Sequence, residues 1–284
     1  MSWSLENKQV VITGASRGIG RTTTLAIAKM GAHVSLVVRD RALGEKVIEE
    51  LRALGTKGKA DLFIADLSSQ KEIRRVSAEI LAKHDVIDVL INNAGAIFMD
   101  RTVTVDGLER TFATNHLGYF LLTDLLLPAL KKAPKARIVN VASAAHNRAV
   151  LDFTDLQSER GFAGVKVYGR SKLANILFTR ALAKRLSGTN VTVNCLHPGV
   201  IASQFGHNNK GVFGFLVKLG SVFLSSEEDG AKTTVHVACS PELDGVTGKY
   251  FSESKEKTPS KEAQDDDSAN KLWEVSLELV KKSA

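Results

Sequence analysis

The sequence predicts an α/β fold, in which a doubly wound parallel sheet of about seven strands carries helices on both faces. Short apolar runs rich in Val and Ile alternate along the chain with helical segments of about 10 residues or more, which is the pattern of βαβ units. A glycine-rich turn follows the first of these runs and leads into the first helix. Neither a linker nor an internal repeat interrupts the alternation, so we expect one domain over residues 1–284.

The predicted strands are nearly continuous apolar runs, as is typical of strands buried on both faces. They span residues 9–13, 33–38, 62–65, 86–91, 137–141, 191–196 and 248–251. The predicted helices have apolar residues at helical spacing, and the first two end at a glycine. They span residues 19–30, 41–54, 69–83, 107–132, 168–186 and 268–280. We expect the polar stretch 252–267 to be an exposed loop, so that 252–284 forms a C-terminal loop and helix.

The composition narrows the class of protein. With 38 Lys+Arg and 31 Asp+Glu the net charge is +7, and 44% of the residues are hydrophobic. These values exclude disorder, while the basic balance admits a nucleic acid, a membrane surface or an anionic cofactor as partner. Two cysteines exclude a disulfide framework and favour a reducing compartment. The sequence shows no secretory signal, no apolar run of about 18 residues and no zinc-binding histidine spacing, so we predict a cytoplasmic protein with no integral membrane segment and no metal.

Residues 13–20 read Thr-Gly-Ala-Ser-Arg-Gly-Ile-Gly and lie between the first strand and the first helix. Glycines at this point allow a tight turn and a close approach of the backbone to a pyrophosphate, and the helix N-terminus offers unpaired N–H groups. The spacing differs by one residue from the commonest fingerprint, but its place favours a dinucleotide site over an ordinary tight turn. The predicted contacts are Gly14, Ser16, Arg17, Gly18, Ile19 and Gly20.

The end of the second strand bears on the choice of cofactor. An acidic side chain there accepts from a ribose 2′-OH, whereas an arginine accommodates a 2′-phosphate. This chain has Arg39, followed by Asp40, and Arg17 lies in the glycine turn on the same side of the predicted ribose. We therefore predict NADP(H) rather than NAD(H). Asp40 is the feature that favours NAD(H), and the alternative for both arginines is a solvated surface position.

Tyr168 and Lys172 are spaced i and i+4 on a predicted helix and share one face. An ammonium one turn away favours the phenolate, so we expect Lys172 to lower a tyrosine pKa that starts near about 10. Such a phenol can exchange a proton with a carbonyl or an alcohol near neutral pH. Ser143, just beyond the fifth strand, offers a hydroxyl to the substrate oxygen. Asn115, in the helix after the fourth strand, is expected to hold a water that relays protons toward the lysine.

These motifs, in this order, resemble the classical short-chain dehydrogenase/reductase family. The resemblance covers most of the chain and rests on residues 13–20, Asp66-Leu67, Asn92-Asn-Ala-Gly95, Asn115, Ser143, Tyr168 with Lys172, and Pro198-Gly199. It implies a Rossmann-type fold and a catalytic tetrad of Asn115, Ser143, Tyr168 and Lys172. The implied cofactor contacts are Asp66 and Leu67 at the adenine, Asn93, Ala94 and Gly95 along the cofactor, Pro198, Gly199 and Ile201 at the nicotinamide, Ser203 at its carboxamide, and Lys172 with Tyr168 at its ribose.

Finer features resemble the retinol dehydrogenase branch, which commonly prefers NADP(H). They are Asn115-His-Leu-Gly118, Phe120-Leu-Leu-Thr123, residues 171–178, His197-Pro-Gly199 and Leu272-Trp-Glu-Val-Ser276. The resemblance implies a lipophilic substrate of the retinal or retinol kind, and a homodimer or homotetramer.

Residues 202–225 follow the sixth strand and contain Phe205, Phe213, Phe215 and Phe223. An apolar segment interrupted by glycines beside a cofactor cleft predicts a lid over a lipophilic substrate. Packing on the core or on a partner subunit, and shallow peripheral contact with a membrane, stay open as alternatives.

The leading hypothesis is an NADP(H)-dependent oxidoreductase that interconverts an alcohol and an aldehyde or ketone. A carbonyl or steroid reductase of different substrate range is one alternative, and a non-catalytic NADP(H)-sensing or scaffold protein on the same fold is another. We predict no nucleic-acid partner, because no known binding motif is present and the acid-free stretch from Arg160 to Ser226 surrounds Tyr168 and Lys172.

Overall fold

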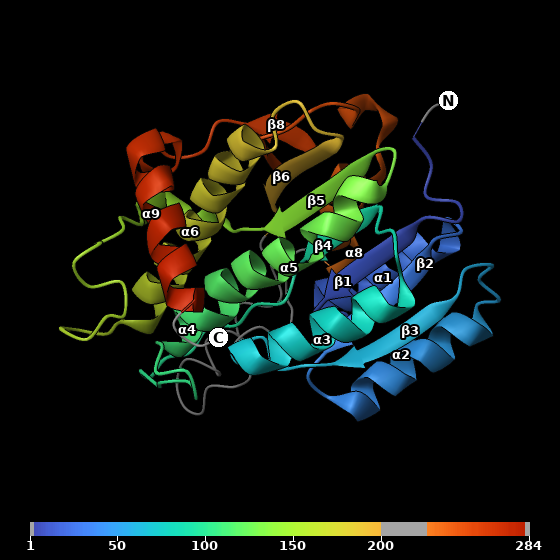
Figure 1. Ribbon diagram of the computed structural model, residues 1–284, viewed down its shortest axis with the longest axis horizontal. Helices are drawn as coiled ribbons and strands as arrows, with labels where there is room; N and C mark the ends of the chain where they lie inside the picture. Colours follow the sequence, from blue (N-terminus) through green and yellow to red (C-terminus); the bar gives the residue numbers. More distant parts are fainter. Residues whose placement is uncertain (1–2, 200–225, 282–284) are drawn as a thin grey trace.

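The computed structural model describes residues 3–199 and 226–281, and a twisted sheet lies at its centre (Figure 1). Within these ranges the sheet has eight strands in the order β3-β2-β1-β4-β5-β6-β7-β8. The strands are β1 (Gln9–Thr13), β2 (His33–Val38), β3 (Ala60–Ile64), β4 (Val89–Asn92), β5 (Ala136–Val141), β6 (Val191–His197), β7 (Tyr250–Ser252) and β8 (Lys255–Lys257). All neighbours are parallel except β7 and β8, which pair antiparallel. The predicted doubly wound α/β sheet is confirmed, with one strand more than expected.

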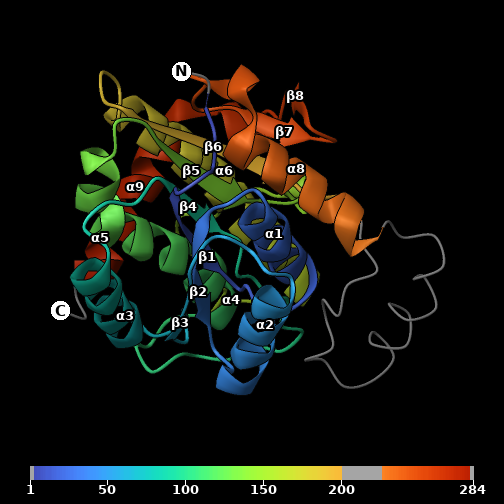
Figure 2. The ribbon, with the colours of Figure 1, turned by 90° about the vertical axis from the view of Figure 1, so that its right-hand side faces the viewer.

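Helices cover both faces of the sheet, as Figure 2 shows almost edge-on. One face is covered by α1 (Gly18–Lys29), α2 (Arg41–Ala53) and α8 (Glu227–Cys239), and the other by α3 (Gln70–Lys83), α5 (Gly118–Lys132) and α6 (Gly164–Arg185). The last helix, α9 (Asp266–Lys281), packs on α6. Because successive strand residues point to opposite faces, Val10 and Ile12 of β1 join the α1 side of the core, and Val11 joins the α5 side.

The stretch 252–267, expected to be an exposed loop, is more ordered than that. It contains β8 and a short 3-10 helix, Glu262–Gln264, in which Ala263 is fully buried. The sequence of β8 is Lys-Glu-Lys and all three residues are exposed, so the strand has no apolar pattern. It forms through backbone pairing with β7, which depends on the fold and not on local side chains.

The predicted helix 107–132 is divided into three parts. A single turn of α-helix, α4 (Arg110–Phe112), is followed by a π-helical turn, Ala113–Leu117, and then by α5. The buried carboxylate of Glu109 caps α4 by accepting from the N–H groups of Thr111 and Phe112. A π turn bonds i to i+5 and is often found at functional sites. Helical apolar spacing does not reveal it, which explains why the prediction was wrong here.

The predicted helix 168–186 begins earlier than expected. In the structure α6 starts at Gly164 and its N-cap residue, Ala163, makes no side-chain capping bond among the described residues, so no sequence signal marks this start. Tyr168 and Lys172 therefore lie inside the helix and not at its beginning.

The carboxyl ends of β1 and β4 are joined by the Thr13 hydroxyl, which is fully buried. Its Oγ1 accepts from the N–H groups of Asn93 at 2.9 Å and Ala94 at 3.0 Å. The strand order reverses between β1 and β4, and in open α/β sheets such a switch point is where ligands bind. Thr13 thus holds the edge of the sheet at which a site is expected.

We predict that Thr13→Val destabilises the fold. Valine keeps the volume but leaves two half-buried N–H groups without an acceptor, at up to about 1–3 kcal/mol each. Urea unfolding should show a free energy of unfolding lower by about 2 kcal/mol or more. The matched control is Thr23→Val, since Thr23 is equally buried and its Oγ1 has no partner among the described residues. Equal stability losses in the two variants would contradict the prediction.

Candidate active site

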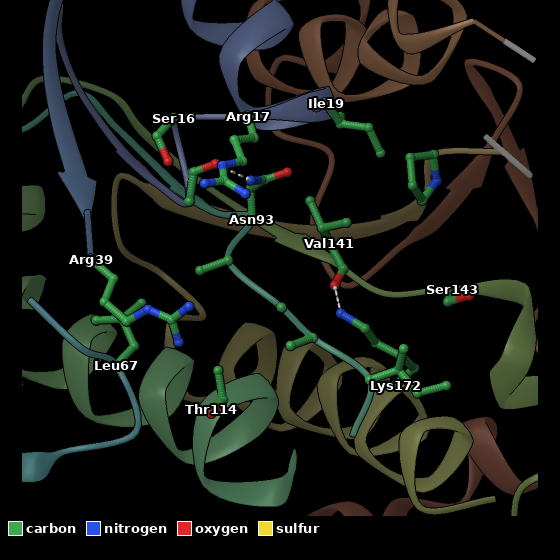
Figure 3. A pocket seen from close by; sticks show the side chains of 18 of the residues that line it. Ser16, Arg17, Ile19, Arg39, Leu67, Asn93, Thr114, Val141, Ser143 and Lys172 are labelled. Carbon is green, nitrogen blue, oxygen red and sulfur yellow. Dashed lines mark hydrogen bonds between the residues drawn. The ribbon is translucent and has the colours of Figure 1, made fainter. Parts of the chain in front are cut away.

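A cavity of about 850 Å³ opens at the carboxyl ends of the strands, across the switch point (Figure 3). It brings together most of the site residues predicted from the sequence. These are Gly14, Ser16, Arg17, Gly18, Ile19, Gly20, Arg39, Asp66, Leu67, Asn93, Ala94, Gly95, Ser143, Tyr168, Lys172, Pro198 and Gly199. Ile201, Ser203 and the predicted lid 202–225 lie outside the described residues.

The structure adds lining residues that the sequence analysis missed. They are chiefly apolar or small residues next to the motifs, among them Val38, Ala65, Ile97, Phe98, Thr114, Ala144, Ala145 and His197. Apart from His197, which belongs to the motif His197-Pro-Gly199, such residues carry no chemical signal of their own. Their position at the end of a predicted strand, or beside a motif, is the only feature that could have found them.

The glycine turn packs against the side chain of Asn93, which follows β4. The Asn93 amide donates to the carbonyl oxygen of Thr13 at 2.9 Å. A Cβ at Gly20 would lie 2.1 Å from the Gly14 oxygen and 2.4 Å from Asn93 Nδ2, so only glycine fits there. Glycine at position 20 is therefore required for the packing of this turn.

The helix after this turn begins without a side-chain cap. The N-cap residue of α1, Arg17, makes no side-chain capping bond among the described residues, whereas Asp40, Ser69 and Ser226 cap α2, α3 and α8. The first N–H groups of a helix have no partner within the helix. At α1 these groups belong to residues that line the cavity, and together with the positive end of the helix dipole they suit an anion.

Two arginines line the same end of the cavity as the glycine turn. Figure 3 shows Arg17 and Arg39 extending from neighbouring elements, with Leu67 beside Arg39. Asp40, which was expected to favour a ribose hydroxyl, caps α2 by accepting from the Leu43 N–H at 3.2 Å. Its other oxygen lies 4.0 Å from the Arg17 guanidinium. One oxygen of Asp40 is thus engaged by the protein itself, and Arg39 and Asp40 both line the cavity.

The opposite end of the cavity holds Lys172. Its ammonium is almost completely buried and donates to the carbonyl oxygen of Val141 at 3.0 Å (Figure 3). The nitrogen lies 5.6 Å from the centre of the Tyr168 ring, as expected for side chains one helical turn apart. Burial lowers the pKa of Lys172 to about 7, because the charged form loses its hydration.

Tyr168 differs from the sequence prediction in its acidity. Burial raises the pKa of Tyr168 to about 12, and a hydrogen bond with Ser143 only partly opposes this. The expectation that Lys172 lowers the pKa of Tyr168 is therefore wrong for the protein without a bound ligand. The reason is that the same burial leaves Lys172 only partly protonated near neutral pH, so its charge does not offset the desolvation of a phenolate.

Asn115 lies in the π turn and is completely buried. It does not line the cavity but lies next to Gly95, which does. Its Oδ1 accepts from the Ala96 N–H at 2.9 Å, and its Nδ2 donates to the Ala96 carbonyl at 2.9 Å and to Ser171 Oγ at 3.0 Å. The side chain thus joins the segment after β4 to helix α6. A water relay at this residue stays a prediction.

Within residues 3–199 and 226–281, no three His, Cys, Asp or Glu side chains gather closely enough to bind a metal ion. None of the helices in those ranges combines the length and the apolar character that a bilayer crossing requires.

Comparison with known proteins decides the family. A profile of the short chain dehydrogenase family matches residues 8–211. The chain belongs to this family. It is 42% identical to retinol dehydrogenase 12 of Mus musculus over 276 residues, covering 97% of this chain and 87% of that protein. It is 40% identical to retinol dehydrogenase 14 of Homo sapiens over 294 residues, with 97% and 87% covered. The predicted retinol dehydrogenase-like branch is therefore confirmed.

Solved structures agree with this assignment. A putative uncharacterized protein from Mycobacterium paratuberculosis superposes with a TM-score of 0.80 at 30% identity, covering 99% of this chain and 96% of that one. The Pseudomonas aeruginosa RhlG/NADP active-site complex superposes with a TM-score of 0.70 at 26% identity, covering 87% and 95%. As a short-chain dehydrogenase/reductase the protein is an oxidoreductase that uses a nicotinamide cofactor, and the residues of the cavity fit such a group because an uncapped helix N-terminus and two arginines line one end of it.

Gly169, next to Tyr168, allows helix α6 to touch the turn that carries Ser143. A Cβ at this position would lie 2.9 Å from the Ala145 carbonyl oxygen. Ser143 Oγ in turn accepts from the Ala145 N–H at 3.2 Å. The distance between the Ser143 and Tyr168 hydroxyls therefore depends on backbone contact at Gly169.

We predict that Gly169→Ala impairs turnover more than stability. Alanine favours a helix over glycine by about 1 kcal/mol, which offsets part of the clash. Displacement of the Ser143 turn should nevertheless lower kcat by about 10-fold or more, since misplacements of about 1 Å cost rates of that order. Gly161→Ala is the control, because a Cβ there meets no described atom within 4 Å. An unchanged kcat in Gly169→Ala would contradict the prediction, because the turn that carries Ser143 would then have moved without affecting catalysis.

Proposed function

We propose that this protein is an NADP(H)-dependent oxidoreductase that interconverts a lipophilic alcohol and its aldehyde or ketone, with Tyr168 as general acid/base. The observation that carries the proposal is the division of one cavity into two ends. Arg17 and Arg39 line one end, and Ser143 and Lys172 line the other (Figure 3). Tyr168 also lines the cavity, with its ring 5.6 Å from the Lys172 nitrogen. A dinucleotide that spans the cavity would have its phosphorylated ribose at the first end and its nicotinamide at the second.

The nicotinamide, when bound, supplies or accepts the hydride, and the protein has to move the proton. At neutral pH the raised pKa of Tyr168 keeps its phenol protonated, so the resting site is ready to donate to a carbonyl oxygen. The resting site thus holds the proton that reduction of a carbonyl requires. Once the proton has left, the Lys172 ammonium one turn away stabilises the phenolate, and Ser143 orients the substrate oxygen through its hydroxyl. Asn115 holds the segment around Ala96 in place.

NADP(H) is favoured by charge at the ribose end. Arg39 is exposed at the carboxyl end of β2, and Arg17 follows the glycine turn. Two guanidinium groups suit a 2′-phosphate dianion, which they bind by charge-assisted hydrogen bonds. Asp40 is occupied as the cap of α2 and so competes less for a ribose hydroxyl than its position in the sequence suggests.

A lipophilic substrate fits the apolar residues that line the cavity, such as Ile97, Phe98 and Ala144. The curated relatives named retinol dehydrogenase point to the retinal and retinol class, and a reductase for other carbonyls or steroids is the nearest alternative. A cytoplasmic location, a homodimer or homotetramer, and the lid over residues 202–225 stay predictions from the sequence.

We predict that Tyr168→Phe abolishes turnover while NADPH still binds. Removal of a general acid/base costs about 10²–10⁴-fold in kcat, and loss of one hydroxyl leaves most cofactor contacts in place. The measurement follows nicotinamide absorbance with retinal and a panel of other aldehydes and ketones, and NADPH binding is measured by fluorescence. Wild-type protein that binds NADPH but turns over none of these compounds would favour the sensing or scaffold alternative.

Arg39→Ala should change cofactor preference. Loss of a charge-assisted hydrogen bond of about 1.5–3 kcal/mol predicts NADPH affinity about 10- to 100-fold weaker, with NADH affinity little changed. The matched control is Arg41→Ala, because Arg41 lies two residues away and pairs with Glu45 along the exposed face of α2. Equal losses for NADPH and NADH in Arg39→Ala would contradict a role in recognising the 2′-phosphate.

A further inference from the structure

Two sequence motifs that are far apart in the chain meet in the structure. The first contains Asn115 and His116, and the second ends at Ser276 on α9. His116 Nε2 lies 2.8 Å from Ser276 Oγ, and both side chains are completely buried. The catalytic roles proposed above use neither side chain, so this buried polar pair requires its own explanation.

Aromatic rings hold the imidazole in one orientation. The ring centre of His116 lies 5.0 Å from that of Phe112, 6.4 Å from that of Phe120 and 6.0 Å from that of Phe178. Trp273 of α9 packs edge-on against Phe120 at 4.9 Å and stacks on Phe178 at 6.0 Å. Burial lowers the pKa of His116 to about 3, so the ring is neutral and pairs with the Ser276 hydroxyl as a neutral hydrogen-bonding group.

Asn175 of α6 is also completely buried. Its Nδ2 lies 3.4 Å from the Val141 carbonyl oxygen, the same atom that accepts from Lys172 at 3.0 Å. Among the described residues, neither Asn175 Oδ1 nor His116 Nδ1 has a hydrogen-bond partner. Within those residues, the bond to Ser276 is therefore the one hydrogen bond of the imidazole.

His116 also lies next to Asn115 in the π turn. A π turn is an uncommon conformation, and neighbouring structure has to stabilise it against the regular α-helix. Within the described residues, Asn115 bonds to Ala96 and Ser171 on one side of this turn and His116 bonds to Ser276 on the other. In Figure 1, α9 runs along α6 toward α4, the turn just before the π segment.

We propose that His116 and Ser276 are positioning residues for the reaction, through which α9 holds the π turn that carries Asn115. The proposal rests on the function proposed above. It assigns to the C-terminal helix a part in the geometry of the active site, although α9 contributes no residue to the described lining of the cavity.

The test compares Ser276→Ala with wild type. Ser276→Ala removes one oxygen atom and leaves the imidazole without its partner. We expect kcat to fall by about 10-fold while KM for the substrate and the dissociation constant for NADPH change by less than about 2-fold, because the displaced groups act on the reacting atoms. In an Asn115→Ala background the same change should add less than about 2-fold, since residues that act through one another are not additive.

A readout independent of turnover is amide hydrogen exchange. Exchange at residues 113–117 should accelerate in Ser276→Ala, because the π turn loses its bond to α9. The control is Asp266→Asn, which weakens the ion pairs of α9 with Arg180 and Lys184 but leaves His116 untouched. Ser276→Cys, which is close in size and has a weak S–H donor, should show a smaller loss than alanine and gives a second test should alanine not fold.

Three results would overturn the proposal: unchanged kcat in Ser276→Ala, unchanged exchange at residues 113–117, or an equal fall of kcat in Asp266→Asn. If the wild-type protein turns over no carbonyl or alcohol, the proposed function fails. In that case the exchange experiment still decides whether α9 holds the π turn.

Discussion

The hydrogen bond from Lys172 to the Val141 carbonyl, 3.0 Å long, is the interaction on which the site depends. It places a nearly buried ammonium at the carboxyl end of β5, inside a region where any charge loses its hydration. The acidity of the neighbouring groups follows from this. The pKa of Lys172 falls to about 7 and that of Tyr168 rises to about 12 through the same burial. At physiological pH the Tyr168 phenol is therefore neutral, whereas Lys172 is divided between its charged and neutral forms.

The two ends of the cavity differ in how their backbone groups are used. At the glycine turn, the first N–H groups of α1 are available to bind an anion, because among the described residues no side chain caps the helix. At the other end, the Lys172 ammonium and the Val141 carbonyl are already hydrogen-bonded to each other. The first end can bind a charged ligand, whereas the second end holds a fixed geometry around Tyr168. Thr13, which joins β1 to β4, keeps the two ends on a single rigid edge of the sheet.

Features that depend on neighbouring residues in the sequence could be predicted from it. The strands 9–13 and 33–38 have the same limits in the structure, because apolar runs bounded by turn residues specify them locally. Most of the cavity lining was likewise marked by the glycine turn and by the polar residues that follow strands. These signals require no knowledge of the packing of distant segments.

Features that arise from distant packing could not be predicted. His116 in the π turn bonds to Ser276, which is 160 residues away in the chain, and helical periodicity carries no trace of that contact. The pKa of Tyr168 has the opposite shift from the one expected because its burial results from tertiary packing, whereas the i, i+4 spacing reports only the nearby lysine.

The antiparallel strand β8 has a consequence for how molecules of this protein meet in solution. It is the outermost strand of the sheet on the β7 side, and an outer strand exposes unpaired backbone groups to which a strand of another molecule can add. Here Lys255, Glu256 and Lys257 are all exposed along that edge. Charged side chains at an edge disfavour such pairing, so β8 protects a sheet rich in Val and Ile from joining edge to edge into aggregates.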